Sequence, residues 1–448
     1  MKIDLYYEIE NGIFEFVDKT FDSEINLIFF NSIDSKYLRF IRCTFTDEME
    51  IGSFVQNDLS ILFYNCNFEK QIYINHCSIK KLIFNNICEL RDLQITDVEI
   101  EELIINSKYE LENCNIEVTD ISISKLLSLS RLKIKKGGLS LTYNFDNTEN
   151  DKKRRASMIN FRCENAYFMG DFGTLIDFRN SKIKTIRFDH CTFQKAVFDK
   201  TSFGINSSFF DCKFSSNTSF RDCTNQDKLV FQSCLFESFS HFNESSFNNF
   251  KLLHTTFEKK ASFDKVKVNS IELYQTSFLQ GGFFDDIEIF SLNNCNRKTL
   301  RTIKQELQKA DNRIDYNRFK SYELAAYNKE IGWKDNFKDK FILSATWFST
   351  GFDHSWLRAM VFTLLSAIIF YCLFLISEDY LNSFEVYNGK EFFSGYFRFL
   401  LITDFYNPLI EERKFLTEPL SWLVFIVGKI VIAFGIYEII QAFRKFKT

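Results

Sequence analysis

Large apolar side chains, most of them phenylalanine, return every five or six residues between positions 183 and 283. This period fits neither an α-helix, which repeats about every 3.6 residues, nor a simple strand, which alternates about every two. It predicts a chain that turns a corner at each repeat and points one large side chain at a common axis. The phenylalanines expected to fill this axis are Phe188, Phe193, Phe198, Phe203, Phe209, Phe214, Phe236, Phe247, Phe257, Phe278 and Phe283.

A small residue stands two positions before most of these large residues. A small side chain fits where the next corner crowds the axis. Coils of this kind stack, pair their backbones with the coils above and below, and bury a continuous core. The small positions are Cys191, Ala196, Thr201, Ser207, Cys212, Thr218, Cys234, Ser240, Ser245, Thr255, Ala261, Thr276 and Gly281.

This pattern of large and small residues resembles the pentapeptide-repeat family, and the phenylalanine bias is similar to that family as well. The resemblance implies a right-handed four-sided β-helix with one coil per four repeats. The alternative, an ordinary β-sandwich, would show alternating polarity and turns rich in glycine and proline. The chain has 2 prolines in 448 residues, Pro408 and Pro419. Their scarcity suits an uninterrupted backbone ladder, because proline removes a hydrogen-bond donor.

Changes of period along the chain divide it into five parts. Residues 1–143 carry degenerate, isoleucine-rich repeats and are expected to form the same type of solenoid. Residues 144–159 are polar and are interpreted as a loop or hinge, and 160–298 form the regular β-helix. Residues 299–340 show helical spacing and are predicted to cap the last coil and link it to a membrane domain at 341–448.

The 12 cysteines follow the repeat and not the spacing of a metal site. Paired metal ligands usually stand about two to four residues apart. The sequence therefore favours small buried thiols over metal ligands or disulfides, and buried thiols fit a reducing compartment. Two series recur at eleven-residue spacing: Cys66, Cys77 and Cys88, and Cys212, Cys223 and Cys234.

Nothing in the sequence points to catalysis or to nucleic acid. The five histidines are scattered, and the common nucleotide-binding, hydrolase and metalloprotease motifs are missing. The chain is therefore not expected to be an enzyme or to hold a metal or cofactor. The net charge of −4, without a long lysine–arginine run, argues against nucleic-acid binding. A protein partner on a face of the solenoid is expected instead.

The last hundred residues predict two membrane spans, at about 357–377 and 420–443, with a short re-entrant or interfacial helix at about 391–404 between them. Lysines and arginines flank the outer ends of the two spans, whereas the connecting loop is acidic. By the positive-inside rule, the solenoid and the C-terminus are expected in the cytoplasm. The expected location is the cell membrane, specifically a bacterial inner membrane.

A span, a short helix and a second span are the plan of a two-span pore. The segment from Phe393 to Pro408 resembles the pore helix and filter of potassium-channel-like proteins. The resemblance implies a filter at Thr403, Asp404, Phe405, Tyr406 and Asn407. Both glycines that let potassium-filter carbonyls face the ion are missing here, which puts potassium selectivity in doubt.

The second span carries small residues seven apart on one face, Ser421, Gly428, Gly435 and Ala442, a pattern that lets helices approach closely in lipid. Lys429 falls near mid-membrane and Glu438 lies on the opposite side of the helix. Such a charge marks either a water-filled path or a structural contact, with Asp404 as one candidate partner of Lys429.

These features predict a membrane-anchored solenoid that senses or docks a partner, joined to an oligomeric pore. A pore requires several copies of a two-span chain, four by analogy with two-span channels. Such a pore could serve stress response or antiviral defence. The alternative is a pore-less, membrane-tethered scaffold for protein interactions.

Overall fold

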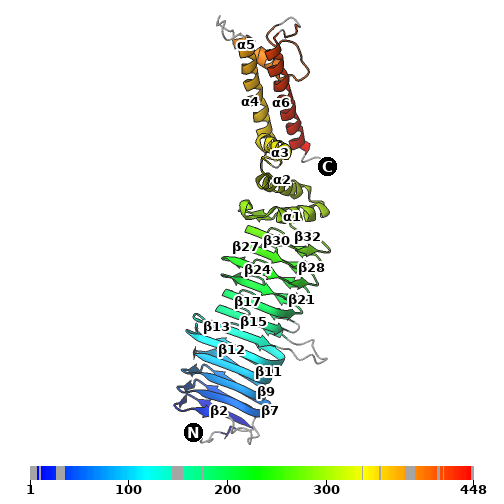
Figure 1. The fold of residues 1–448 in the computed structure, drawn as a ribbon. Helices are drawn as coiled ribbons and strands as arrows, with labels where there is room; N and C mark the ends of the chain where they lie inside the picture. Colours follow the sequence, from blue (N-terminus) through cyan, green and yellow to red (C-terminus); the bar gives the residue numbers. More distant parts are fainter. Residues whose placement is uncertain are drawn as a thin grey trace. The chain divides into compact units, whose positions relative to one another are not determined.

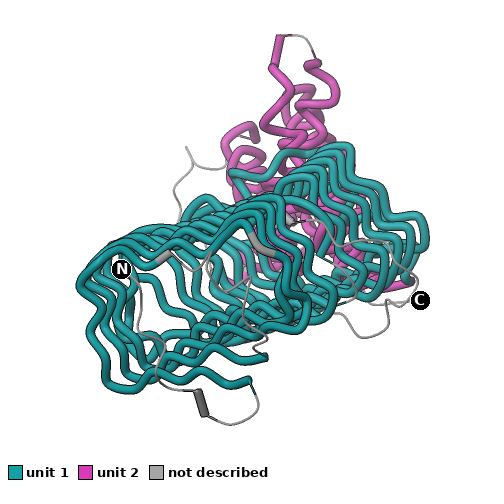
Figure 2. Tube along the Cα trace, turned by 90° about the horizontal axis from the view of Figure 1, so that it is seen from below, with its two compact units in different colours: residues 1–310 teal, residues 311–448 magenta. Residues whose placement is uncertain are grey.

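The protein is described by a computed structural model covering residues 8–9, 12–26, 36–143, 155–172, 175–334, 336–352, 355–378, 389–410, 414–416 and 418–444. The chain divides into two compact units, residues 1–310 and 311–448 (Figures 1 and 2). The first is a β-solenoid that ends in one helix, and the second is helical. Most of the predicted hinge, residues 144–154, lies outside the described residues.

The first unit is a parallel β-solenoid of about 11 turns, as the five-residue period predicts. Each coil pairs with the next in register: Ala196 pairs with Thr218, Thr218 with Ser240, and Ser240 with Ala261. These partners stand 22, 22 and 21 residues apart. A coil therefore holds about four repeats of five or six residues. Figure 2 shows the stacked coils along the Cα trace.

In the first half of the solenoid, long strands run around the corners of the coil. The pairings are parallel, except that β1 is antiparallel to β2. The strands are β1 Glu8–Ile9, β2 Ile13–Val17, β3 Thr20–Phe21, β4 Ile25–Asn26, β5 Tyr37–Ile41, β6 Thr44–Phe45, β7 Met49–Tyr64, β8 Asn67–Phe68, β9 Ile72–Ile87, β10 Glu89–Leu90, β11 Asp92–Ser107, β12 Cys114–Ser128 and β13 Gly137–Tyr143.

In the second half, the strands are shorter and the corners more distinct. The strands are β14 Arg155–Ser157, β15 Arg162–Asp171, β16 Ile176–Asp177, β17 Lys182–Phe193, β18 Ala196–Val197, β19 Ser202–Phe203, β20 Ser207–Phe210, β21 Lys213–Phe214, β22 Thr218–Ser219, β23 Thr224–Asn225, β24 Lys228–Gln232, β25 Leu235–Phe236, β26 Ser240–His241, β27 Ser246–Leu253, β28 Thr256–Phe257, β29 Ala261–Ser262, β30 Lys267–Tyr274, β31 Ser277–Phe278, β32 Gly282–Phe283 and β33 Glu288–Ile289. Strand β14 pairs with β12 and β16, so the structure places residues 155–157 in the ladder and not in a loop.

Stacked phenylalanines fill the axis of the second half. In one column, Phe198 stacks on Phe220 at a ring-centroid distance of 4.6 Å, Phe220 on Phe242 at 5.0 Å, and Phe242 on Phe263 at 4.9 Å. Offset stacking of this kind adds about 0.5–1.5 kcal/mol per pair to the burial of the rings. Of the eleven phenylalanines predicted for the axis, ten are buried: Phe188, Phe193, Phe198, Phe203, Phe209, Phe214, Phe236, Phe247, Phe257 and Phe278.

The eleventh, Phe283, is not in the core, and this part of the prediction is wrong. Phe283 is only half-buried, and its neighbour Phe284 is fully buried and stacks on Phe263 at 4.8 Å. The small position of this last coil is accordingly Gly282, whose Cβ, if present, would lie 2.9 Å from the Phe284 ring. The repeat takes six residues here where the sequence prediction took five.

The small inward position is also a hydrogen-bonding position, which the sequence analysis did not foresee. Thr201 Oγ1 donates to the Phe178 carbonyl at 2.8 Å, and Ser245 Oγ donates to the Phe220 carbonyl at 2.6 Å. Cys223 Sγ makes the same contact with the Phe198 carbonyl at 3.0 Å. Each such donor reaches the carbonyl of a large inward residue one coil earlier. Serine, threonine and cysteine therefore suit this position because they are small and can donate.

Left-handed corners recur about twice per coil and explain three of the five histidines, His76, His190 and His254. His190, Asp211 and Asp222 have φ values of 50°, 50° and 54°, and each directly precedes a small cysteine. His76 and His254 occupy the same kind of corner. Corners one coil apart contact each other, as in His190 Nδ1 to Asp211 Oδ2 at 2.8 Å. These histidines are corner residues of the coil.

A helix covers the C-terminal end of the solenoid, as predicted. After the short helix η3 (Leu292–Asn294), α1 (Arg297–Lys309) packs on β30 and β32. The hydroxyl of Thr299 accepts from the Leu273 amide at 2.9 Å, and the carboxylate of Glu306 accepts from the Gly282 amide at 3.0 Å. The amides of the last coil have no further coil to pair with, so these side chains satisfy them.

The described residues of the second unit form five helices: α2 Arg313–Glu330, α3 Phe337–Ser349, α4 Trp356–Ser377, α5 Gly389–Leu400 and α6 Pro419–Arg444. The predicted spans, 357–377 and 420–443, coincide with α4 and α6 within about one residue. The predicted short helix, 391–404, corresponds to α5 but ends at Leu400. The region 299–340, predicted as one helical cap and linker, contains α1, α2 and the start of α3.

Candidate functional site

Helices α4 and α6 are long and apolar enough to cross a membrane, and they pack against each other. Only 39% of the most apolar stretch of α4 and 33% of that of α6 is buried. The core helix of a water-soluble protein would bury most of such a stretch. Here large apolar side chains such as Ile369 and Ile430 remain mostly exposed. Exposed apolar area of this extent fits a helix pair surrounded by lipid.

The predicted small-residue stripe lies on the buried side of α6. Ser421, Gly428, Gly435 and Ala442 are all buried. Contacts with α4 of the same chain account for three of them. Ser421 Oγ lies 3.0 Å from Ser377 Oγ, a Cβ on Gly428 would lie 2.9 Å from Phe370 Cβ, and a Cβ on Gly435 would lie 3.1 Å from Thr363 Cβ.

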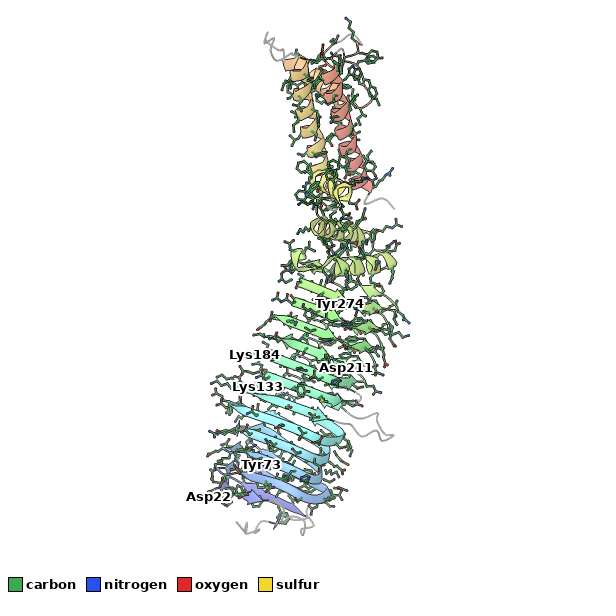
Figure 3. The ribbon with its side chains drawn as sticks, viewed as in Figure 1. Asp22, Tyr73, Lys133, Lys184, Asp211 and Tyr274 are labelled. Carbon is green, nitrogen blue, oxygen red and sulfur yellow. The ribbon has the colours of Figure 1, made fainter. Side chains whose placement is uncertain are left out.

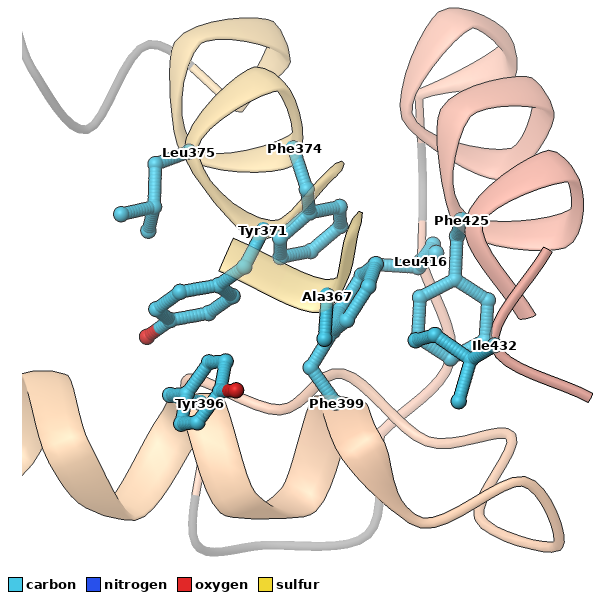
Figure 4. Packing of buried hydrophobic residues seen from close by; sticks show 9 residues of the cluster. All are labelled: Ala367, Tyr371, Phe374, Leu375, Tyr396, Phe399, Leu416, Phe425 and Ile432. Atoms are coloured by element: carbon cyan, nitrogen blue, oxygen red, sulfur yellow. The ribbon is translucent and has the colours of Figure 1, made fainter. Parts of the chain in front are cut away.

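Helix α5 packs against the C-terminal half of α4 and the N-terminal half of α6, so it lies beside the two long helices and not beyond their ends. Its buried side chains, Tyr396 and Phe399, point toward Tyr371 and Phe374 of α4 and Phe425 of α6 (Figure 4). Tyr396 also donates through its hydroxyl to a carbonyl of α4, that of Leu364, at 3.1 Å.

The opposite face of α5 and its continuation expose large apolar side chains at every fourth position: Phe393, Phe397, Leu401 and Phe405. Helix α5 is thus apolar on both sides.

The ammonium of Lys429 lies at the C-terminal end of α5. It donates to the carbonyl of Leu401 and, at 3.4 Å, to that of Arg398. The rings of Phe425 and Phe399 face the same Nζ at 4.8 and 5.5 Å. The last carbonyls of a helix lack partners within the helix and carry the negative end of its dipole, so a cation there is stabilised.

Lys429, only 5% exposed, therefore caps α5 within one chain. Asp404, the acidic partner that the sequence suggested, lies near enough to attract the Lys429 charge. The direct contacts of the ammonium, however, are main-chain carbonyls and aromatic rings. Sequence reasoning found this lysine by its position in an apolar helix. It could not find the carbonyls, because they carry no residue signature.

The predicted filter residues form a compact succession of turns. The Asp404 carboxylate accepts from the Tyr406 amide at 3.1 Å, and the Asn407 side chain accepts from the Leu409 amide at 3.0 Å. The Asn407 amide in turn donates to the Lys414 carbonyl at 2.8 Å. Thr403 and Phe405 are exposed, Asp404 and Tyr406 are half-buried, and Asn407 is buried. These hydrogen bonds stabilise the conformation of the segment.

Glu438 serves a different part of the unit from Lys429. It is 4% exposed, and its carboxylate accepts from the hydroxyl of Thr350 at 3.0 Å. Thr350 follows α3 directly, so this contact fixes the end of α3 against α6. At the same end of the helix pair, Trp356 of α4 stacks on Phe443 of α6 at 5.5 Å.

A basic surface runs along one side of the solenoid. Lys133, Arg162 and Lys182 stand on successive coils in register, and Lys184 lies two residues further along its coil (Figure 3 labels Lys133 and Lys184). They line a hollow of about 390 Å³. Arg162 forms an ion pair with Glu110 at 3.7 Å, and Lys184 forms one with Glu164 at 3.3 Å. In-register like charges repel, so an acidic group bound here would relieve that repulsion.

Ten of the 12 cysteines are buried and Cys88 and Cys372 are half-buried, and the fold does not pair them as disulfides. All 12 are free, and within the described ranges no cluster of histidine, cysteine and acidic residues could hold a metal ion. Burial raises the pKa of the Cys77, Cys114 and Cys163 thiols to about 12, which keeps them protonated and unreactive at neutral pH.

No family model matches the chain, and comparison with curated proteins and with solved structures found no match. The parallel solenoid with two apolar helices is consistent with a pentapeptide-repeat-like fold.

Proposed function

We propose that this protein is a membrane-anchored docking protein, in which α4 and α6 hold the chain in the bilayer and the solenoid binds a protein partner. One observation carries this proposal. The helix pair leaves most of its apolar surface exposed, whereas its buried polar and small residues contact other helices of the same chain. Lys429 caps α5, Glu438 fixes α3, and Gly435 makes room for α4. A helix pair with these contacts can anchor the chain in a bilayer without a second copy of the chain.

The docking surface is the basic surface of Lys133, Arg162, Lys182 and Lys184. Repeat proteins use the long side of a solenoid to bind extended partners. Stacked cations complement a partner segment rich in aspartate and glutamate. Lys133→Glu combined with Lys182→Glu should abolish binding of a fluorescent oligoglutamate peptide to the full chain. Lys228→Glu, an exposed lysine outside the hollow, should leave binding unchanged. Equal binding by all three proteins would refute this choice of surface.

An oligomeric pore, tetrameric by analogy with two-span channels, is the second candidate. The exposed apolar stripe of α5, from Phe393 to Phe405, favours it, because neighbouring copies could cover that stripe. Against it, Lys429 places a fixed cation at the C-terminus of α5, where helix ends in membrane proteins can hold a transported cation. A role of such a pore in stress response or antiviral defence stays a prediction.

Reconstitution of the full chain into liposomes distinguishes the two candidates. The anchor proposal expects the protein to stay with the membrane after alkaline washing and to give no ion flux above that of empty liposomes. Flux in the wild type that Lys429→Met alters would favour the pore and overturn the anchor reading. Release of the protein by alkaline washing would overturn both.

Sidedness is part of the proposal: both ends lie in the cytoplasm of a bacterial cell, and Lys414 lies outside. A Lys414→Cys chain, with the half-buried Cys88 and Cys372 changed to serine, should react with an impermeant maleimide on intact cells. Lys338→Cys in the same background should react only after lysis. The reverse pattern would invert the topology. Lys447, a second useful position, lies outside the described residues.

A further inference from the structure

Helix α3 exposes aromatic side chains where a water-soluble helix would carry polar ones. Phe337, Phe341 and Phe348 are each about 60% exposed, and Trp347 is 49% exposed. Trp333, just before the helix, lies tilted against Phe337 at a ring-centroid distance of 6.0 Å, and Phe337 stacks on Phe341 at 6.2 Å. An apolar face of this size on a short helix is a binding surface.

The position of α3 is fixed at one end of the α4–α6 pair. Arg358, in the first turn of α4, donates to the Phe348 carbonyl at 3.1 Å and lies over the Trp347 ring at 5.0 Å. In addition, the hydroxyl of Thr350, which follows α3, donates a hydrogen bond to the carboxylate of Glu438 in α6. If α4 and α6 span the bilayer, α3 therefore lies at the level of the headgroups, where tryptophan and basic side chains concentrate.

Between α2 and α3 lies a groove of about 680 Å³ that combines two chemistries. Trp333, Phe341, Trp347 and Phe348 give it an apolar lining, and Lys329 and Lys340 add two cations. No carboxylate is among the described residues that line it. A cavity of about 300–1,000 Å³ with a few polar groups is typical of a small-ligand site.

The groove also holds an acceptor without a partner. The Asn328 side-chain oxygen is buried and accepts no hydrogen bond. Lys340 is held beside it, because its ammonium donates to the Asn328 main-chain carbonyl. A ligand with an acyl chain and a phosphate would fill the apolar lining and pair with the lysines.

We propose that the groove between α2 and α3 binds an anionic phospholipid of the bilayer in which α4 and α6 are anchored. This inference rests on the anchor proposed above. The acyl chain lies along the aromatic lining, and the headgroup phosphate lies at Lys329 and Lys340. The bound lipid ties the segment that precedes the first span to the membrane surface.

Tryptophan fluorescence of the full chain in nanodiscs tests the proposal. Trp356→Phe and Trp422→Phe leave Trp333 and Trp347 of the 4 tryptophans as reporters. Phosphatidylglycerol with brominated chains should quench them at a roughly tenfold lower fraction in the bilayer than brominated phosphatidylcholine does. Both headgroups carry a phosphate, but only phosphatidylglycerol has a net negative charge for the two lysines to attract, because choline neutralises the phosphate of phosphatidylcholine. Equal quenching by the two lipids in this protein would overturn the proposal without any further substitution.

Three variants locate the site. Lys329→Gln with Lys340→Gln should remove the preference, whereas Lys334→Gln with Lys338→Gln, outside the groove, should keep it. Ala345→Phe should fill the groove and lower quenching by both lipids while both lysines remain. Loss of the preference in the Lys334 and Lys338 variant would instead indicate general surface attraction and overturn the groove site. A chain that does not enter nanodiscs would contradict the anchor and not the groove.

Discussion

The solenoid and the helical unit satisfy their buried polar groups in different ways. In the solenoid one contact is repeated: a small inward side chain such as Thr201 or Ser245 donates to a carbonyl of the preceding coil. In the helical unit, the contacts of buried polar groups differ from one another, and that of Lys429 with the end of α5 occurs once. A repeated contact can be recognised from the sequence period. A contact that occurs once requires the structure.

The largest expected effect is in the solenoid and compares two neighbouring phenylalanines of its last coil, Phe283 and Phe284. Phe284→Ala should lower the free energy of unfolding by about 3–5 kcal/mol, because it leaves a cavity under a stacked ring. Phe283→Ala should cost well under half of that, since Phe283 is only half-buried. Thermal unfolding followed by the β-sheet circular dichroism signal of the full chain makes the comparison.

Equal losses for the two alanine variants would contradict the assignment of Phe284 to the axis. A larger loss for Phe283→Ala would restore the five-residue count at this coil.

In the helical half, the matching test concerns a glycine. Gly435→Leu should destabilise the α4–α6 pair by about 1–3 kcal/mol or more, because a side chain there meets Thr363 and Phe362 of α4. Val427→Leu, on the exposed side of α6, is the control and should cost little. Disulfide trapping between cysteines placed at Ser377 and Ser421, whose hydroxyls are 3.0 Å apart, reports whether the helices still meet.

Unchanged trapping in the Gly435→Leu chain would show that this glycine does not set the approach of α4 and α6. Loss of oligomers with trapping intact would instead place the small-residue stripe between copies of the chain.

A third prediction concerns the contact that distinguishes the helical half most clearly. Lys429→Met should weaken the end of α5 by about 1–2 kcal/mol, because carbonyls at that end lose their cation. Hydrogen exchange of residues 396–410 should quicken, while exchange in the solenoid stays the same. Lys390→Met, at the exposed start of α5, is the control. Faster exchange in the control and not in Lys429→Met would refute the capping role.

The sequence predicted the solenoid closely because its signal is repeated. Large and small residues alternate over many coils, so errors at single positions do not change the register. The exception is instructive: Gly281, Gly282, Phe283 and Phe284 fit the pattern in two ways. The structure uses the second, in which the Gly282 amide bonds to Glu306 of the capping helix. That choice depends on a contact from outside the repeat.

The helical unit was predictable in its lengths but not in its contacts. Hydropathy located both long helices, because about 20 apolar residues are needed to cross a bilayer. It marked Lys429 as unusual and suggested a pore axis or Asp404 as its environment. The structure places main-chain carbonyls and aromatic rings in direct contact with the ammonium, and Asp404 lies near enough to attract its charge. The groove of α2 and α3 had no sequence signal beyond scattered aromatic residues.

The last prediction concerns pH, which should change the stability of the solenoid through its buried thiols. Burial raises the pKa of the Cys114 thiol from an ordinary 9.0 to about 12 in the folded solenoid. Above pH 9 the unfolded chain releases this proton and the folded chain keeps it, so stability falls as pH rises from 9 toward 12. Each such thiol contributes a slope of at most about 1.4 kcal/mol per pH unit.

Cys114→Ala should flatten the loss of solenoid stability between pH 8 and 10, as measured by urea unfolding. Cys372→Ala, in α4, should not change that slope. The same slope in the wild type and the Cys114→Ala chain would mean that this thiol already ionises normally in the fold.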